Sequence, residues 1–171
     1  MSVIRTTNFF GIDINPFAVE LAKTTLNIAK KIAFEERKET VVQLYEQGFL
    51  DVDPSLPLDN LDENVVCADA LFTEWPAADA IVGNPPFLGM QRMREELGPD
   101  RWDQIRQKFG SGGGDLCAFW FRRAHQRLSP AGRAGLVATS AIRFGAARRT
   151  ALDFIVQNGG RIAEAISAKP W

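Results

Sequence analysis

Three short apolar segments of this chain each end at or close to a polar residue, and helical patterns separate them along the sequence. The segments are residues 8–13, 65–67 and 79–83. Apolar runs of this length, bounded by turn signals, are typical of buried strands. Strands that alternate with helical patterns indicate βαβ units with right-handed crossovers. The sequence therefore predicts an α/β fold, with a mostly parallel sheet flanked by helices.

The rest of the chain continues this alternation. Asn15-Pro16 opens a helix, because proline is favoured at the first helical position, and the helical spacing fades in the charged stretch 35–39. Asp115 can cap a helix over residues 116–128, which Pro130 and Gly132 would end. The other predicted elements are a loop at 47–64, one or two short helices in 88–108, a flexible hinge at 111–114, a strand at 135–139, a helix at 146–157 and a last strand at 162–166.

Size and composition bound the class of protein. The 171 residues, 46% of them hydrophobic and 24% charged, suit one soluble domain with a real core. The net charge of −1 provides no basic field for nucleic acid, which argues against a self-sufficient DNA binder. The sequence shows no membrane span and no signal peptide, so we expect a cytoplasmic protein. Cys67 and Cys117 are interpreted as small, reduced core residues, and no metal site is expected.

The tetrapeptide Asn84-Pro85-Pro86-Phe87 begins where the apolar run 80–83 stops. Ligands of open α/β sheets bind outside the carboxyl ends of the strands. The Asn84 side-chain carbonyl and the Pro85 carbonyl can both accept from an exocyclic amine. Phe87 can stack on a planar base, a contact worth roughly 1–3 kcal/mol. The alternative is a plain turn, since Asn-Pro is a common turn starter.

Aspartates follow the two earlier predicted strands. Asp13 ends the first, where an acid can accept both hydroxyls of a ribose. Asp69 ends the second, where a carboxylate can accept from an adenine amine. For both residues the alternative is a cap or loop aspartate.

Together these motifs resemble those of class I adenine-N6 DNA methyltransferases, which use S-adenosylmethionine (AdoMet). The resemblance is closest to the methyltransferase region of large type II restriction–modification enzymes that fuse nuclease, methyltransferase and target recognition, and to related phage-defence methyltransferases. It covers nearly the whole chain and rests on Gly11-Ile12-Asp13-Ile14-Asn15-Pro16, Cys67-Ala68-Asp69-Ala70-Leu71, Asn84 to Gly89, Arg92-Met93-Arg94, Gly114-Asp115-Leu116, Thr139 to Ile142, Arg148-Arg149 and Lys169-Pro170-Trp171.

The resemblance implies a Rossmann-like fold and transfer of a methyl group from AdoMet to the N6 amine of a flipped-out adenine. The implied catalytic residues are Asn84, Pro85, Pro86 and Phe87. The implied cofactor-binding residues are Asp13, Ile14, Asp69, Ala70 and Asn84.

The chain also departs from the family pattern. The family's glycine-rich loop and first strand would precede Asp13, yet residues 1–7 contain no glycine. We therefore expect residues 1–171 to be a single partial methyltransferase domain, a fragment without the target-recognition and nuclease parts, and with little activity alone. DNA would bind through the missing recognition domain. The lost strand would leave an unpaired sheet edge, which predicts a homodimer.

Two alternatives remain. Release-factor glutamine methyltransferases and some RNA guanine-N2 methyltransferases share an Asn-Pro-Pro-aromatic core, usually with tyrosine at the fourth place, so Phe87 favours adenine. The other alternative is a non-catalytic remnant that acts only in assembly. His125, the single histidine, is interpreted as a solvated or capping residue.

Overall fold

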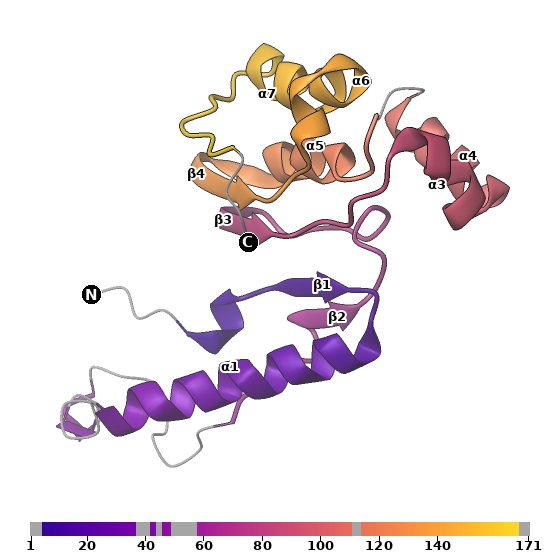
Figure 1. The fold of residues 1–171 in the computed structure, drawn as a ribbon. Coiled ribbons are helices and arrows are strands. Elements are labelled where there is room, and N and C mark those ends of the chain that lie inside the picture. The colour runs from indigo at the N-terminus through magenta and orange to yellow at the C-terminus, as the bar shows by residue number, and fades with distance from the viewer. Residues whose placement is uncertain (1–4, 37–41, 44–45, 49–57, 111–113, 168–171) are drawn as a thin grey trace. The chain divides into compact units, whose positions relative to one another are not determined.

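The computed structural model describes residues 5–36, 42–43, 46–48, 58–110 and 114–167. It divides the chain into two compact units, Met1–Glu74 and Trp75–Trp171. Each unit contains one pair of parallel strands together with helices (Figure 1). Mixed helices and short parallel sheets agree with the predicted α/β class. The Rossmann-like arrangement, the single partial domain and the homodimer stay predictions.

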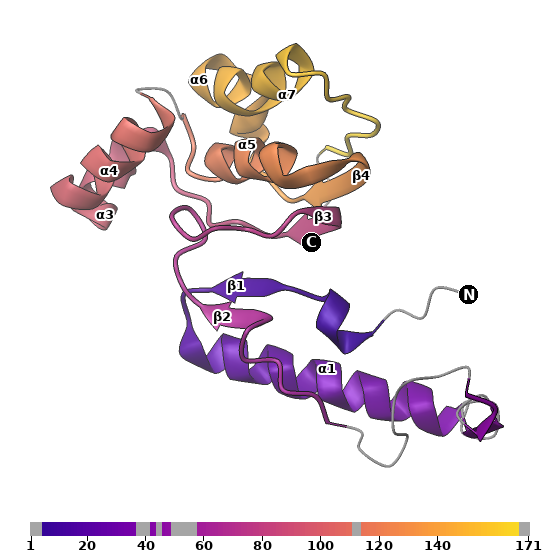
Figure 2. The same cartoon turned by 180° about the vertical axis from the view of Figure 1, so that it is seen from behind.

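The first unit is a strand–helix–strand element. After a 3-10 turn, Thr6–Asn8, come β1 (Gly11–Asp13), α1 (Pro16–Glu36) and β2 (Val65–Cys67). β1 and β2 pair in parallel, with Asp13 opposite Cys67. α1 runs along this pair (Figure 2). Its Val19 shares the buried interior of the unit with Leu61, Val65 and Leu71. The predicted strand 8–13 is thus shortened to its last three residues, because its start forms the 3-10 turn.

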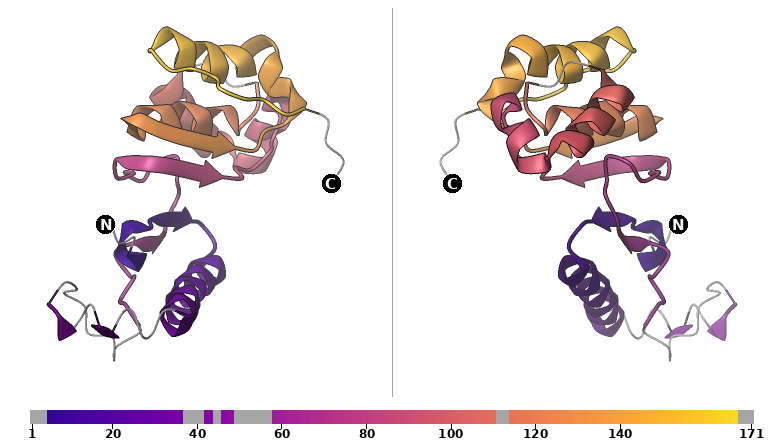
Figure 3. Two further views of the ribbon diagram at one scale, coloured as in Figure 1. Left: turned by 90° about the vertical axis from the view of Figure 1, so that its left-hand side faces the viewer. Right: turned by 90° about the vertical axis from the view of Figure 1, so that its right-hand side faces the viewer.

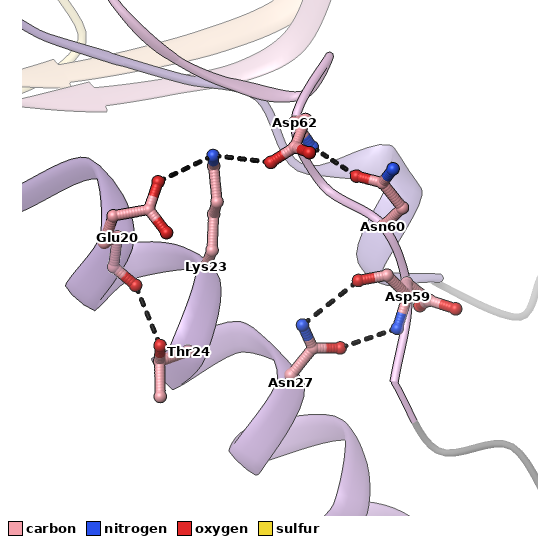
Figure 4. A network of polar contacts seen from close by, with 7 residues as sticks. All are labelled: Glu20, Lys23, Thr24, Asn27, Asp59, Asn60 and Asp62. Carbon is pink, nitrogen blue, oxygen red and sulfur yellow. Dashed lines mark hydrogen bonds and ion pairs between the residues drawn. The ribbon is translucent and has the colours of Figure 1, made fainter. Parts of the chain in front are cut away.

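A polar network fastens the segment before β2 to α1 (Figure 4). Lys23 Nζ lies 2.9 Å from Glu20 Oε1 and 2.7 Å from Asp62 Oδ1. The hydrogen bonds to Asp62 and Glu20 raise the pKa of Lys23. The Asn27 amide pairs with both backbone groups of Asp59, accepting at 2.8 Å and donating at 3.2 Å. The network holds the approach to β2 beside α1, and so sets the parallel pairing with β1.

The second unit alternates strands and helices over a longer stretch (Figures 1 and 3). β3 (Ala78–Gly83) and β4 (Leu128–Leu136) form its parallel pair. Between them lie α3 (Met90–Leu97), α4 (Pro99–Phe109) and α5 (Ala118–Arg127). After β4 come a 3-10 turn, Ser140–Arg143, then α6 (Gly145–Arg148), a π-helical turn, Arg149–Asp153, and α7 (Phe154–Gln157).

Helices supply most of the buried apolar side chains of this unit. Met93, Ile105 and Phe119 are almost fully buried, and the rings of Phe109 and Phe119 lie 5.0 Å apart. Ala118, Ala147 and Ala151 form a tight contact in which α5 meets α6 and the π-helical turn. Small side chains let these helical segments approach closely.

β4 differs from the predicted strand at 135–139. It starts earlier, at Leu128, and contains Pro130 and Gly132, which were expected only to end the preceding helix. The pairing register skips here: Ala78 faces Leu128, but Ala80 faces Arg133. Proline lacks the amide donor of a sheet ladder and is tolerated at bulges. The helix therefore ends before Pro130, at Arg127, as predicted, and the irregular register accommodates Pro130 within β4.

The predicted last strand at 162–166 is wrong. The described part of the chain has no strand there, and residues 161–167 are exposed. The apolar pattern alone could not show that no neighbouring strand would pair with it. The predicted loop at 47–64 and the hinge at 111–114 fall partly outside the described residues, at 49–57 and 111–113. Among the described helices, none is long and apolar enough to cross a lipid bilayer.

The two cysteines occupy different environments. Cys117 is fully buried, as predicted, whereas Cys67 is exposed, because it ends the short strand β2 rather than entering a core. Burial, with a smaller contribution from the Asp115 carboxylate, raises the pKa of the Cys117 thiol to about 12. Cys117 therefore stays protonated near neutral pH, and only thiolates are reactive.

We expect one fast and one slow thiol when the folded protein is titrated with an aromatic disulfide at about pH 8, close to the ordinary thiol pKa. Cys67→Ser should remove the fast phase, and Cys117→Ser the slow one. Two equally fast thiols would contradict the burial of Cys117.

Gly114 is a second test of the packing. Its φ of +63° is unfavourable for other residues, and a Cβ there would lie 2.5 Å from the Ala147 backbone nitrogen. Gly114→Ala is expected to lower the free energy of unfolding by about 1–3 kcal/mol, measured by denaturant titration. Gly135→Ala is the control: nothing lies within 4 Å of that Cβ, so the change should stay within roughly 0.5 kcal/mol. Equal effects of the two substitutions would contradict the close contact between Gly114 and α6.

Candidate active site

The predicted catalytic tetrapeptide follows β3 directly. Pro85 is buried, Asn84 and Pro86 are exposed, and the Phe87 side chain is 45% exposed. Within the described residues, neither the Asn84 side-chain amide nor the Pro85 carbonyl has a hydrogen-bond partner. The segment after β3 thus has two acceptor oxygens without hydrogen-bond partners among the described residues, and it exposes the Asn84 side chain and part of an aromatic ring.

Hydrogen bonds hold the chain on both sides of the tetrapeptide. Upstream, the Val137 N–H donates to the Gly83 carbonyl at 3.1 Å. Downstream, Leu88 is buried, and its carbonyl accepts from the Leu116 N–H at 2.8 Å. The Met90 N–H donates to the Gly114 carbonyl at 3.0 Å. The tetrapeptide, with two prolines of fixed φ, therefore bridges two points that hydrogen bonds hold in place, Gly83 and Leu88.

The Asp115 carboxylate is central to the downstream anchor, and it is only 4% exposed. Its Oδ1 accepts from the Leu88 N–H at 3.3 Å and from the Cys117 N–H at 3.2 Å. Its Oδ2 accepts from Thr139 Oγ1 at 2.8 Å. The sequence predicted Asp115 only as a helix cap, and α5 in fact begins at Ala118, with Cys117 at the capping position. The long-range bonds could not be foreseen, because they join residues far apart in the chain.

The predicted cofactor residues lie at the carboxyl end of the β1–β2 pair. The Ala68 N–H donates to the Asp13 carbonyl at 2.9 Å, so Asp13 and Asp69 follow paired strands at the same edge. The Asp69 Oδ1 accepts from the Leu71 N–H at 2.9 Å, and Ala70 is half-buried. The structure therefore brings Asp13, Ile14, Asp69 and Ala70 to one edge of the first unit, while Asn84 to Phe87 belong to the second unit.

Asp13 keeps one carboxylate oxygen available. Its Oδ1 accepts from the Asn15 N–H at 2.7 Å, and the described residues offer its Oδ2 no partner. The cap of α1 is supplied by Asn15, whose Oδ1 accepts from the Phe17 N–H at 2.9 Å. Asp13 is exposed, as is the adjacent Ile14 side chain, at 73%. An exposed carboxylate beside an exposed apolar side chain fits a ribose joined to a flat base.

Other polar residues of the second unit have structural partners. His125 Nε2 lies 3.2 Å from the Asn158 carbonyl oxygen. The Arg122 guanidinium donates to the Phe109 carbonyl at 3.1 Å and lies over the Phe154 ring. Arg123 is buried and lies over the Trp75 ring. Within the described ranges, no three His, Cys, Asp or Glu side chains group so as to hold a metal ion.

Comparison with known proteins gives two matches. The family model described as "MmeI, DNA-methyltransferase domain" matches residues 1–171. DNA methyltransferase A of Bacillus subtilis (strain 168) is 34% identical to the chain over 101 residues, which cover 54% of this chain and 11% of that protein. The matched part is thus about a tenth of the length of this relative. Since the family model spans every residue given, the chain belongs to the MmeI DNA-methyltransferase domain family.

Proposed function

We propose that this chain carries the residues that transfer a methyl group from AdoMet to the N6 amine of adenine in DNA. Membership of a DNA-methyltransferase domain family supports the general reaction. The choice of adenine N6 rests on one observation: two acceptor oxygens without partners among the described residues, on Asn84 and Pro85, belong to the same tetrapeptide as the partly exposed Phe87 ring.

Two acceptors suit an amine that must act as a nucleophile. The Asn84 side-chain carbonyl and the Pro85 carbonyl would each accept one N–H of the adenine amine and so orient its nitrogen lone pair. As the nitrogen–methyl bond formed, the sulfur–methyl bond of the sulfonium would break and leave a neutral thioether. The nitrogen would gain positive charge, which preorganised acceptors stabilise, and would then lose one proton to water. Such a transfer depends on positioning and needs no strong general base.

The base must leave the duplex to reach these acceptors. Phe87 would stack on the extruded adenine and replace the base stacking that the adenine loses when it leaves the DNA duplex. The prolines fix φ at two successive positions, so Asn84 and Phe87 lose little conformational freedom when the base binds.

The edge formed by β1 and β2 is proposed to hold AdoMet, which supplies an electrophilic methyl group on a sulfonium. Asp13 would accept the ribose hydroxyls with its available oxygen, and Asp69 would accept from the adenine amine. Ile14 and Ala70, next in sequence, would lie against the cofactor. Asn84, which the resemblance also implies as a cofactor-binding residue, belongs to the second unit.

We further propose a restriction–modification or phage-defence setting, which rests on the resemblance of the motifs to such enzymes and is compatible with the matched DNA-methyltransferase family. The net charge of −1 makes this chain a poor DNA-binding surface by itself. Most contacts to DNA are therefore proposed to come from a separate recognition segment, with the tetrapeptide reserved for the flipped base.

Asn84→Ala should lower the rate of methyl transfer on the order of 10²–10³-fold, the effect of removing one preorganised hydrogen-bonding group. The measurement is transfer of a labelled methyl group from AdoMet to unmethylated DNA by the full-length protein that contains this chain. Methylated nucleosides are then identified by mass spectrometry.

Asn84→Asp is the matched variant, because it keeps an acceptor oxygen of the same size and should retain more activity than Asn84→Ala. Transfer to a release-factor peptide or to guanine in RNA, and not to DNA adenine, would contradict the proposal. So would an Asn84→Ala variant as fast as the parent.

Asp13→Ala should weaken AdoMet binding about 10- to 100-fold, since hydrogen bonds to a charged group contribute about 1.5–3 kcal/mol. Calorimetric titration measures this without turnover. Glu63→Ala is the control: it removes an exposed carboxylate just before β2, at the opposite end of that strand from Asp69. An affinity reduced equally by both substitutions would point to a charge effect and contradict a direct contact from Asp13.

A further inference from the structure

The buried carboxylate of Asp115 forms no hydrogen bond with the tetrapeptide itself, yet it accepts from three donors: its near neighbour Cys117 and two residues in other segments, Leu88 and Thr139. Burying a carboxylate is unfavourable unless its oxygens are well paired. An alanine or leucine could fill the same space in a helix-packing core. A buried carboxylate with three donors is therefore expected to hold particular segments in place.

Each donor belongs to a segment that borders the candidate site. The Leu88 N–H is next to Phe87, and the Cys117 N–H belongs to the turn before α5. Thr139 follows β4, two residues after Val137, whose N–H holds the Gly83 carbonyl next to Asn84. Asp115 thus links the segment that anchors the start of the tetrapeptide to the residue that anchors its end.

We propose that Asp115 is a positioning residue for methyl transfer: it holds Asn84 and Phe87 in the mutual geometry that one adenine ring requires, acting through the Leu88 N–H and Thr139. This inference rests on the proposed function of the tetrapeptide. A displacement of about 1 Å at a reacting group can slow a reaction about 10²-fold. Loss of one anchor next to Phe87 is enough for such a displacement.

The variants differ in how many of the three hydrogen bonds to Asp115 they remove, and this sets the expected order of their transfer rates. Asp115→Ala removes all three hydrogen bonds. Asp115→Asn keeps one acceptor oxygen for the two N–H groups and presents an amide to Thr139, whose hydroxyl can turn to accept it. Thr139→Val removes only the hydroxyl that Oδ2 accepts from. The transfer rate should therefore fall least in Asp115→Asn and most in Asp115→Ala.

The experiment is single-turnover methyl transfer to DNA by the full-length protein, with the rate expressed per AdoMet-binding site so that only folded molecules count. Asp115→Ala is expected to be about 10²-fold slower than the parent, and Thr139→Val roughly 10-fold slower. The AdoMet dissociation constant should be unchanged in both, because Asp13 and Asp69 belong to the other unit. Hydrogen exchange should accelerate in residues 84–90.

Ile105→Ala is the control for stability. The Ile105 side chain belongs to α4 and is 1% exposed, and it forms no part of the tetrapeptide or its anchors. The substitution should lower the unfolding midpoint but keep the rate per binding site. Where Asp115→Ala does not fold, Thr139→Val carries the test.

Three results would overturn the inference: parent-like rates per site in Asp115→Ala or Thr139→Val, an equal loss in Ile105→Ala, or a variant that loses AdoMet affinity in step with its rate. No transfer to DNA by the unsubstituted protein would be a different failure. It would refute the proposed function, and the inference would fall with it.

Discussion

A buried carboxylate that accepts from three donors, two of them distant in the chain, organises the second unit. Asp115 joins the chain after the tetrapeptide, the turn before α5 and the segment after β4. Because its oxygens leave water, these bonds form in a low-dielectric setting where each is strong and an unpaired partner is unfavourable. These bonds help to fix a loop that contains two prolines and is also anchored by backbone hydrogen bonds at Gly83, Leu88 and Met90. Gly114 adds to this by letting the same segment lie against the backbone of α6.

The two units handle their proposed ligands in different ways. In the second, the functional groups belong to a short, stiff loop anchored at both ends. In the first, Asp13 and Asp69 follow paired parallel strands, so the ladder itself brings them to one edge. The polar network around Lys23 and Asn27 supports that ladder from the side of α1 (Figure 4). A rigid site for the reacting amine and an open edge for a larger nucleoside suit the proposed reaction.

Much of this arrangement could be predicted from the sequence, because it depends on local patterns. Val65–Cys67 is the predicted strand, Asn15-Pro16 does open α1, and the tetrapeptide does follow β3. Predictions failed where a partner elsewhere in the chain decides the outcome. Residues 162–166 have a strand-like pattern but no partner strand in the described part of the chain. β4 starts earlier than predicted because β3 pairs with it on both sides of Pro130. Cys67 is exposed because its strand ends there.

The sequence by itself determined which residue types stand at the strand ends and the alternation of strands with helices, since both follow from side-chain chemistry and short-range periodicity. The match to the family model likewise needs the sequence alone. Only the tertiary structure decided that Asp13 lies beside the start of the Asp69 loop, that Asn15 relieves Asp13 of capping α1, and that Asp115 is a buried junction. The first and last of these depend on hydrogen bonds between residues distant in the chain, and no local pattern encodes the partner of such a bond. At the start of α1 the sequence offers two neighbouring side chains as the cap, and only the structure shows which of them is used.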